Sequence, residues 1–238
     1  MPEVPLAYKY VALAVMLVEV NYCATRLKLG MSLPARVDDA KRAFVAAPGL
    51  IGFGGRIDFE NYAFSFTKSS HLRYITKLQA GTMYAAGIQP PAGVPLKEHF
   101  TAMAKKRSLI DVDDAFSLAT NWLAAIEVDV QQLMKEQPCE KQQLIIQDSL
   151  KVPIFTIRWG TPGKRPFPRV SVIIDGSTKE LLELRQEDIS YSNRPSELMV
   201  EVTNLLKISD ADFEKFTTEQ KNALLQKHKA KSASGVNP

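Results

Sequence analysis

The sequence predicts an α+β protein with two units, each a helix followed by an antiparallel sheet, plus an N-terminal core helix and C-terminal helices. Three observations predict this class. A long apolar segment opens the chain, short alternating segments with turn residues follow in two clusters, and well-capped helical segments end it. The 238 residues are 45% hydrophobic and 24% charged, as in globular proteins. A chain of this length can bury a core without disulfides or metals.

The segment from Leu6 to Leu29 is predicted to be a buried helix that stops at Gly30, with its polar residues Glu19, Arg26 and Lys28 outside the core. A signal-peptide leader is the alternative, but acidic residues flank the apolar run and no small-residue cleavage site follows it. A retained helix implies a cytoplasmic protein, and a cleaved leader implies a periplasmic or secreted one. We expect no transmembrane segment, because no stretch approaches the roughly 20 apolar residues required.

A four-residue repeat begins each predicted unit. Val-Asp-Asp-Ala occurs at 37–40 and again at 112–115, and each copy is predicted to open a helix that ends in Ala-Ala, at 46–47 and 124–125. In the second copy Asp111 is the predicted N-cap. Its apolar residues follow the i, i+3, i+4, i+7 rule of an amphipathic helix and are Val112, Ala115, Phe116, Ala119, Trp122, Leu123 and Ile126.

Both predicted helices lead into strand-like sequence. The expected strands are Tyr62–Phe66 and His71–Leu78 in the first unit, then Leu144–Ile146, Ile154–Trp159, Val170–Ile174 and Glu180–Leu184 in the second. Asp175-Gly176 is predicted to form the turn of the last hairpin. Alternation predicts that Phe155, Ile157 and Trp159 share one face and are buried with Trp122 in one core. Two cysteines, Cys23 and Cys139, are expected to be buried small apolar residues.

The C-terminal part is predicted to be helical. The expected helices are Pro195–Leu206, a turn with Ser209 and Asp212, and Thr217 to about Lys231 with a Thr-x-x-Gln capping box. The predicted organisation is residues 1–79 for the N-terminal helix and first unit, 80–108 for a linker or long loop, 109–190 for the second unit, 191–231 for the C-terminal helices and 232–238 for a disordered tail.

The last hairpin, with Asp175, Thr178, Glu180 and Leu181 after an alternating strand, resembles the PepSY-type domain. That family shows a helix and then a hairpin of the form Val-x-Val-Asp-x-x-Thr-Gly-Glu-Leu. The resemblance covers about 111–185, with 37–78 as a degenerate second copy, and implies a PepSY/cystatin-like fold that binds or restrains partners. The sequence departs from the family at Lys179, where glycine is usual.

The net charge of +4 lies in one place. Five lysines against a single glutamate between residues 215 and 231 account for it, so the rest of the chain is neutral overall. A basic surface spread over a nucleic-acid footprint is therefore not predicted, and no nucleic-acid partner is expected.

No catalytic, cofactor or metal motif emerges, so none is predicted. The three histidines lack ligand spacing, and Asp111, Asp113 and Asp114 lack the glycine and closing glutamate of a calcium loop. The candidate binding residues lie in the loop before Val170, which carries three cations and one aromatic ring. They are Lys164, Arg165, Phe167 and Arg169.

The favoured function is a non-catalytic binding or regulatory module, holding a peptide or protein of unknown specificity. A hydrolase or small-ligand enzyme with a pocket between the two α+β units is the alternative, and enzyme activity has no positive support from a motif. The sequence indicates neither the ligand nor the oligomeric state.

Overall fold

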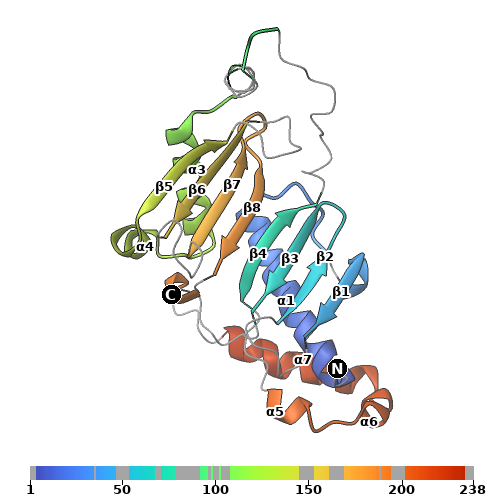
Figure 1. The fold of residues 1–238 in the computed structure, drawn as a ribbon. Helices are drawn as coiled ribbons and strands as arrows, with labels where there is room; N and C mark the ends of the chain where they lie inside the picture. The colour runs from blue at the N-terminus through green and yellow to red at the C-terminus, as the bar shows by residue number, and fades with distance from the viewer. Residues whose placement is uncertain are drawn as a thin grey trace. The chain divides into compact units, whose positions relative to one another are not determined.

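The computed structural model describes residues 4–34, 36–46, 54–67, 71–78, 92–95, 98, 102, 108–144, 153–160, 169–187, 189–193 and 202–233. The α+β class is confirmed, with an N-terminal helix, antiparallel strands and C-terminal helices (Figure 1). The chain divides into two compact units. Unit 1 comprises residues 1–74 and 192–238, and unit 2 comprises residues 75–191.

Helix α1 (Leu6–Arg26) is the core helix of unit 1 and packs on β1. Twelve of its residues are buried, among them Glu19, which is only 3% exposed. The prediction that Glu19 escapes the core is wrong. Its Oε1 accepts a hydrogen bond from Cys23 Sγ at 3.7 Å, one turn later on the same face.

The end of α1 also differs from the prediction. The helix ends at Arg26, and Lys28 takes the left-handed conformation with φ of 52°, while Leu29 N donates to Ala24 O at 3.0 Å. This is the bond pattern of a left-handed cap, formed two residues before Gly30.

By length and mean hydropathy alone, α1 is long and apolar enough to cross a membrane, a test that core helices of globular proteins also pass, and the expectation of no transmembrane segment stays a prediction. Of its most apolar 18-residue window, 61% is buried inside the protein, as in the core helix of a globular protein.

Unit 1 contains the strands β1 (Arg42–Val45), β2 (Gly55–Asp58) and β3 (Tyr62–Phe66), joined by antiparallel pairing. The predicted helix at 37–47 is wrong. A single 3-10 turn, η1 (Val37–Asp39), leads instead into β1. An isolated helix as short as the predicted 37–47 is marginal in water. Pairing with β2 instead satisfies the backbone hydrogen bonds of Arg42–Val45 and buries Val45.

The predicted strands at 62–66 and 71–78 are confirmed as β3 and β4 (Leu72–Lys77), whereas β1 and β2 were not predicted. All five residues of β3 are buried, so its aromatic rings belong to the core. Gly55 lies against α1, because an added Cβ there would stand 2.7 Å from Met16 Cε.

The described C-terminal residues of unit 1 form the helices α5 (Val202–Leu205), α6 (Asp210–Glu214) and α7 (Thr218–Ala233). Both predicted caps are confirmed. Asp212 N donates to Ser209 Oγ at 3.2 Å, and Thr217 and Gln220 bond reciprocally in a capping box. Helix α7 includes Ser232 and Ala233, so the prediction that these two residues belong to a disordered tail is wrong. Residues 195–201 and 234–238 lie outside the described ones.

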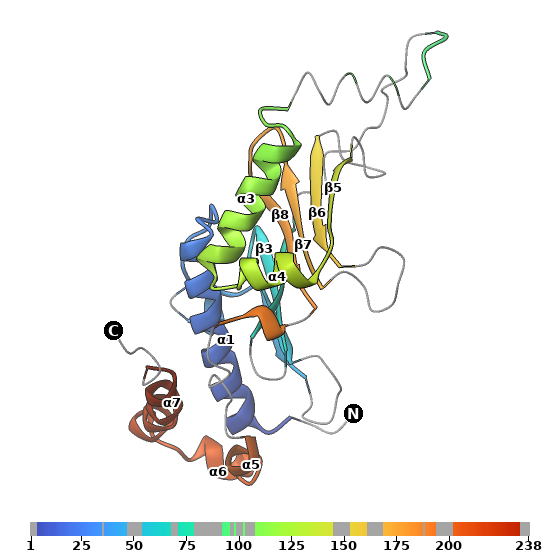
Figure 2. The same cartoon turned by 90° about the vertical axis from the view of Figure 1, so that its left-hand side faces the viewer.

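In unit 2, α3 (Val112–Ala125) and α4 (Val130–Glu136) cover one face of the strands β5 (Cys139–Leu144), β6 (Ile154–Trp159), β7 (Val170–Asp175) and β8 (Leu181–Gln186), as Figure 2 shows. The helix α3 and its Asp111 cap are confirmed, with Asp111 Oδ1 accepting from Asp113 N and Asp114 N. Helix α4 was not predicted. A 3-10 turn, η3 (Ile189–Tyr191), follows β8.

The core of unit 2 is largely as predicted. Phe155, Ile157 and Trp159 are fully buried, and Phe116 of α3 contacts Trp159 at 6.1 Å between ring centroids. Trp122, in contrast, is only half-buried, because the buried stripe of α3 is narrower than predicted and runs through Ala115, Ala119 and Leu123.

Strand β5 begins earlier than predicted, at Cys139, and Ile145 and Ile146 lie outside the described residues. Cys23 is buried as expected, but Cys139 is exposed on β5. The strands of unit 2 follow in the order β8-β7-β6-β5, so β5 has an open edge. The exposure of Cys139 follows from this position, because a residue on an edge strand has a neighbouring strand on one side only. The predicted linker at 80–108 lies mostly outside the described residues.

Candidate functional site

The described part of unit 1 contains a groove of about 690 Å³ that runs along α1. Its floor is one face of the helix, on which the residues recur at spacings of three and one. We call this set the α1 stripe, and it consists of Leu6, Lys9, Tyr10, Leu13, Ala14, Leu17, Val18 and Asn21. At 1.5 Å per residue the stripe is about 22 Å long.

Two other parts of the chain also line the groove. They are the η1 region, with Arg36, Val37 and Asp38, and the helices α6 and α7, with Phe213, Asn222 and Leu225. In Figure 2, α6 and α7 lie beside the first half of α1. The groove is therefore assembled from residues about 200 positions apart in the sequence.

Specific contacts hold the α6–α7 wall in place. Leu6 N donates to Asp210 Oδ1 at 2.8 Å, so a carboxylate satisfies a free backbone donor at the start of α1. Tyr10 and Phe213 contact each other at 5.6 Å between ring centroids, and Lys221 Nζ lies 5.1 Å from the Phe213 centroid. Phe213 is thereby fixed as a buried side chain of the wall.

The floor of the groove remains partly open to solvent. Tyr10 is 36% exposed and Val18 is 40% exposed, although both belong to the apolar core helix. Between them, Leu13 and Leu17 are buried at 8% exposure. Tyr10 and Val18 thus leave apolar surface open to solvent in the groove.

Polar groups lie at defined points of the groove. Asn21 Nδ2 donates to Pro34 O at 2.9 Å, which fixes the orientation of the amide, and its Oδ1 is buried with no hydrogen-bond partner in the described part of the chain. Asn222, which α7 contributes to the lining, is exposed. Lys9, Arg36 and Asp38 are exposed charges, and no ion pair joins them to another described residue.

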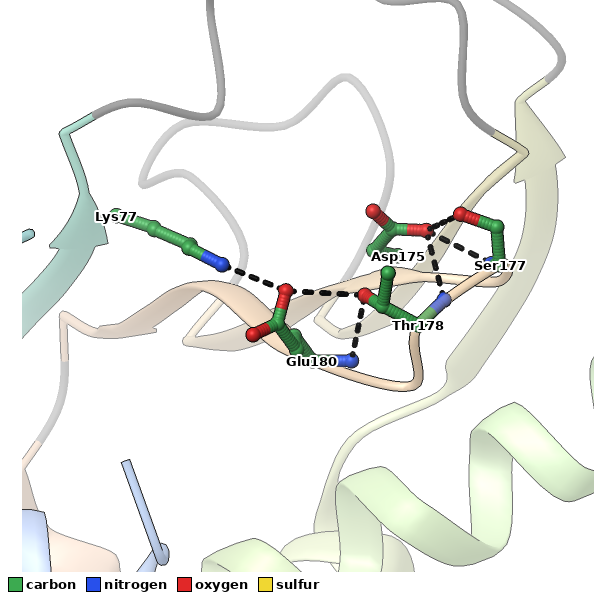
Figure 3. Close-up of polar contacts among 5 residues, drawn as sticks. All are labelled: Lys77, Asp175, Ser177, Thr178 and Glu180. Carbon is green, nitrogen blue, oxygen red and sulfur yellow. Dashed lines mark hydrogen bonds and ion pairs between the residues drawn. The ribbon is translucent and has the colours of Figure 1, made fainter. Parts of the chain in front are cut away.

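The hairpin between β7 and β8 in unit 2 is a second polar cluster (Figure 3). Asp175 Oδ1 accepts from Ser177 N at 2.7 Å, from Ser177 Oγ at 2.6 Å and from Thr178 N at 3.2 Å. Glu180 Oε2 accepts from Lys77 Nζ at 2.6 Å and from Thr178 Oγ1 at 3.1 Å. The hydrogen bond from Lys77 lowers the pKa of Glu180.

These polar groups form hydrogen bonds with one another, and those bonds hold the turn between β7 and β8 in its conformation. Five residues, 176–180, connect the strands, so the predicted Asp175-Gly176 turn is longer than a two-residue hairpin. Lys179 adopts φ of 62° and its N donates to Asp175 O at 2.8 Å. The cluster therefore offers less to a ligand than the groove does.

Of the binding residues predicted from the sequence, only Arg169 is described. It lies immediately before β7, and its carbonyl accepts from Glu187 N at 2.8 Å. Lys164, Arg165 and Phe167 lie outside the described residues. Arg169 is therefore the one candidate of this loop that the described residues include, and a binding role for the loop remains a prediction.

Among the described residues, no group of three or more His, Cys, Asp or Glu side chains is arranged to hold a metal ion. His71 is buried, and its backbone N donates to Thr67 Oγ1 at 3.2 Å. Asp111, Asp113 and Asp114 form the N-terminal cap and first turn of α3, as predicted from their spacing.

No protein-family model matches the chain, and neither a curated protein nor a solved structure matches it.

Proposed function

We propose that the chain is a non-catalytic binding module and that the groove along α1 holds an apolar segment of its partner. The exposed apolar floor is the observation that supports this most directly. Tyr10 and Val18 present apolar surface to solvent along a helix whose other side forms a core. Covering that surface with a partner removes it from water, which stabilises a complex.

The size and chemistry of the groove also support binding. A volume of about 690 Å³ lies within the range of ligand sites in proteins. Its lining is mostly apolar with a few polar side chains near the ends, the composition that fixes the orientation of a ligand. The charged side chains of the lining, Lys9, Arg36 and Asp38, form no hydrogen bond with one another among the described contacts.

We also propose that residues 111–185 form a PepSY-like domain. The order of a helix followed by an antiparallel hairpin supports it. Lys179 supports it as well, because it adopts a left-handed conformation that glycine adopts more readily, and it occupies the position at which the family usually has glycine. A partner-binding role for the chain is compatible with that resemblance.

The groove is tested with an apolar fluorescent dye, anilinonaphthalene sulfonate, titrated against the protein. The variant Val18→Asp places a carboxylate on the floor of the groove. We expect it to weaken dye binding at least about tenfold, because a charge cannot be buried unpaired.

Leu33→Asp is the matched control, since Leu33 is 53% exposed and is not part of the groove lining. Circular dichroism of both variants checks that unit 1 remains folded. Equal dye affinity for Val18→Asp, Leu33→Asp and the unmodified protein would refute the groove as a binding site.

A further inference from the structure

We propose that the sheet of unit 2 carries an anion site on the face opposite α3 and α4, where Arg158, Ser171 and Arg185 bind the phosphate group of a phosphorylated ligand. All three residues belong to unit 2. The site goes beyond the proposed function and does not depend on the groove along α1, which residues of unit 1 form.

The register of the strands brings the three side chains into one row. Trp159 contacts Phe116 of α3, so Arg158, the residue before it on β6, points to the opposite face of the sheet. Arg158 lies directly opposite Ser171 of β7, and Ser171 lies directly opposite Arg185 of β8. Directly opposite residues share a face with their Cβ atoms about 5 Å apart, so the two arginine Cβ atoms stand roughly 10 Å apart with Ser171 between them.

Ser171 supplies a hydroxyl between the two arginines. The residue is 5% exposed, and its side chain makes no hydrogen bond with another described residue. The Thr156 hydroxyl on the same face is fully buried without a partner in the described part of the chain, whereas the Ser171 hydroxyl is not fully buried. A hydroxyl that has no partner and is still reached by solvent can donate a hydrogen bond to an anion above it.

The two arginines differ in their present partners. Arg158 is half-buried and forms no ion pair with another described residue, although Glu140 of β5 lies directly opposite it. The side chain of Arg185 is 35% exposed, and its Nε lies 3.6 Å from Glu187 Oε1, so an anion would share Arg185 with this carboxylate. Because Glu183 lies on the same face as well, we expect modest affinity that falls with added salt.

The set of donors favours a phosphate group over a carboxylate. Each guanidinium is a planar fork that can bond two oxygens at once, and a carboxylate has only enough oxygens for one such fork. A phosphate monoester has three terminal oxygens, which two arginines and a hydroxyl can share. The sequence adds to the local attraction, because residues 158–171 contain four cations and no acidic residue.

The experiment is isothermal titration calorimetry of the full chain with inorganic phosphate at constant ionic strength. Arg158→Gln should weaken phosphate binding at least about tenfold, the size of one charge-assisted hydrogen bond. Ser171→Ala, which leaves every charge in place, should weaken it about three- to tenfold. Lys135→Gln is the matched control, because Lys135 is an exposed cation of the same unit on α4, which lies on the other face; it should change the affinity less than about twofold.

Nuclear magnetic resonance locates the bound anion. The Nε–H signal of Arg158 should shift with phosphate along the same saturation curve as the heat, and circular dichroism checks that each variant is folded. Three results would overturn the site: no saturable heat with phosphate, an equal loss of affinity in Arg158→Gln and Lys135→Gln, or an unchanged affinity in Ser171→Ala. Equal affinity for acetate and phosphate would overturn the preference for a phosphate group.

Two phosphorylated probes distinguish the source of the phosphate group. Tighter binding of a phosphoserine hexapeptide than of glycerol phosphate would support the site and assign it to a phosphorylated protein segment. The reverse order would support the site and assign it to a small phosphorylated molecule. Tighter binding of single-stranded oligothymidylate than of either probe would contradict the assignment to a phosphate monoester.

Discussion

Gly176, the first residue of the β7–β8 turn, is closely surrounded in the core of unit 2. A Cβ added at this position would lie 2.5 Å from Phe155 Cε2, 2.8 Å from Ser108 Oγ and 3.0 Å from Pro153 O. The backbone is tied there as well, because Gly176 N donates to Pro153 O at 2.6 Å and its carbonyl accepts from Leu109 N at 2.8 Å. We therefore predict that Gly176→Ala destabilises unit 2.

The magnitude follows from these contacts. Ordinary Cβ contacts begin at 3.4 Å, so the ring of Phe155 would have to retreat by 3.4 − 2.5, about 0.9 Å. Phe155 is fully buried, so its ring can retreat only by displacing neighbours in the core. Overpacking of this kind costs about 1–3 kcal/mol, offset by about 0.4–1 kcal/mol from the smaller entropy of the unfolded chain. The expected net loss is roughly 1–2 kcal/mol.

Urea unfolding followed by tryptophan fluorescence measures this loss in the relevant unit, because both tryptophans of the chain, Trp122 and Trp159, belong to unit 2. Gly30→Ala is the control, since an added Cβ at Gly30 meets no atom within 4 Å. It should change the free energy of unfolding by no more than about 0.5 kcal/mol, measured by far-ultraviolet circular dichroism. An unchanged fluorescence midpoint for Gly176→Ala would refute the packing argument.

Three further predictions concern unit 2. Lys179→Gly should raise the free energy of unfolding by about 0.5 kcal/mol, because relief of the left-handed backbone exceeds the entropic cost of glycine; a lower urea midpoint would contradict this. The hydrogen bond from Lys77 lowers the pKa of Glu180, so the contribution of this pair to stability is present above the unfolded pKa of 4.5 and is lost as the pH falls through the lower folded pKa. Exposure of the two side chains limits this contribution to less than about 1 kcal/mol, and Lys77→Met should reduce the pH dependence in urea titrations to the smaller part that the hydrogen bond from Thr178 supplies. Trp122→Ala should cost less than the 3–5 kcal/mol typical of a buried aromatic, because Trp122 is half-buried, whereas Trp159→Ala should reach that range since Trp159 is fully buried; equal urea midpoints for the two variants would show that burial does not set the difference.

Local signals predicted the parts of the fold that depend on neighbours in sequence. Asp111 caps α3, Ser209 caps α6 and Thr217 caps α7, because a cap needs only a side chain and the next three backbone amides. Alternation likewise predicted β6 and β7, whose residues are mostly buried.

The errors arose where distant contacts outweigh local preference. β1 and β2 are only four residues long and include charged residues, so their sequences carry little strand signal before they pair with each other. Glu19 lies in an apolar run and is buried with its neighbours. Its charge had predicted an exposed position. Helix α4 is seven residues long, too short for its periodicity to stand out.

The groove could not be predicted because the residues that line it meet only in the folded protein. Leu6 and Leu225 line the same groove from opposite ends of the chain. One signal was present in the sequence, since Lys9 and Asn21 recur on the same helical face as Leu13 and Leu17 and interrupt an otherwise apolar stripe. That pattern indicated an incompletely buried face, although not the elements that flank it.

The division of unit 1 between residues 1–74 and 192–238 has a consequence for the order of events during synthesis. Helix α1 ends at Arg26 and α6 begins at Asp210, so 184 residues must be added before the wall that covers one side of α1 exists. At roughly 5–20 residues per second, that delay is about 10–40 s. During this interval the ribosome carries a 21-residue apolar helix with the hydropathy of a membrane span and without its final cover. Unit 2, being continuous in sequence, can fold in the meantime, whereas a product truncated after unit 2 would keep β1 against α1 but would leave the side of α1 that faces α6 and α7 uncovered.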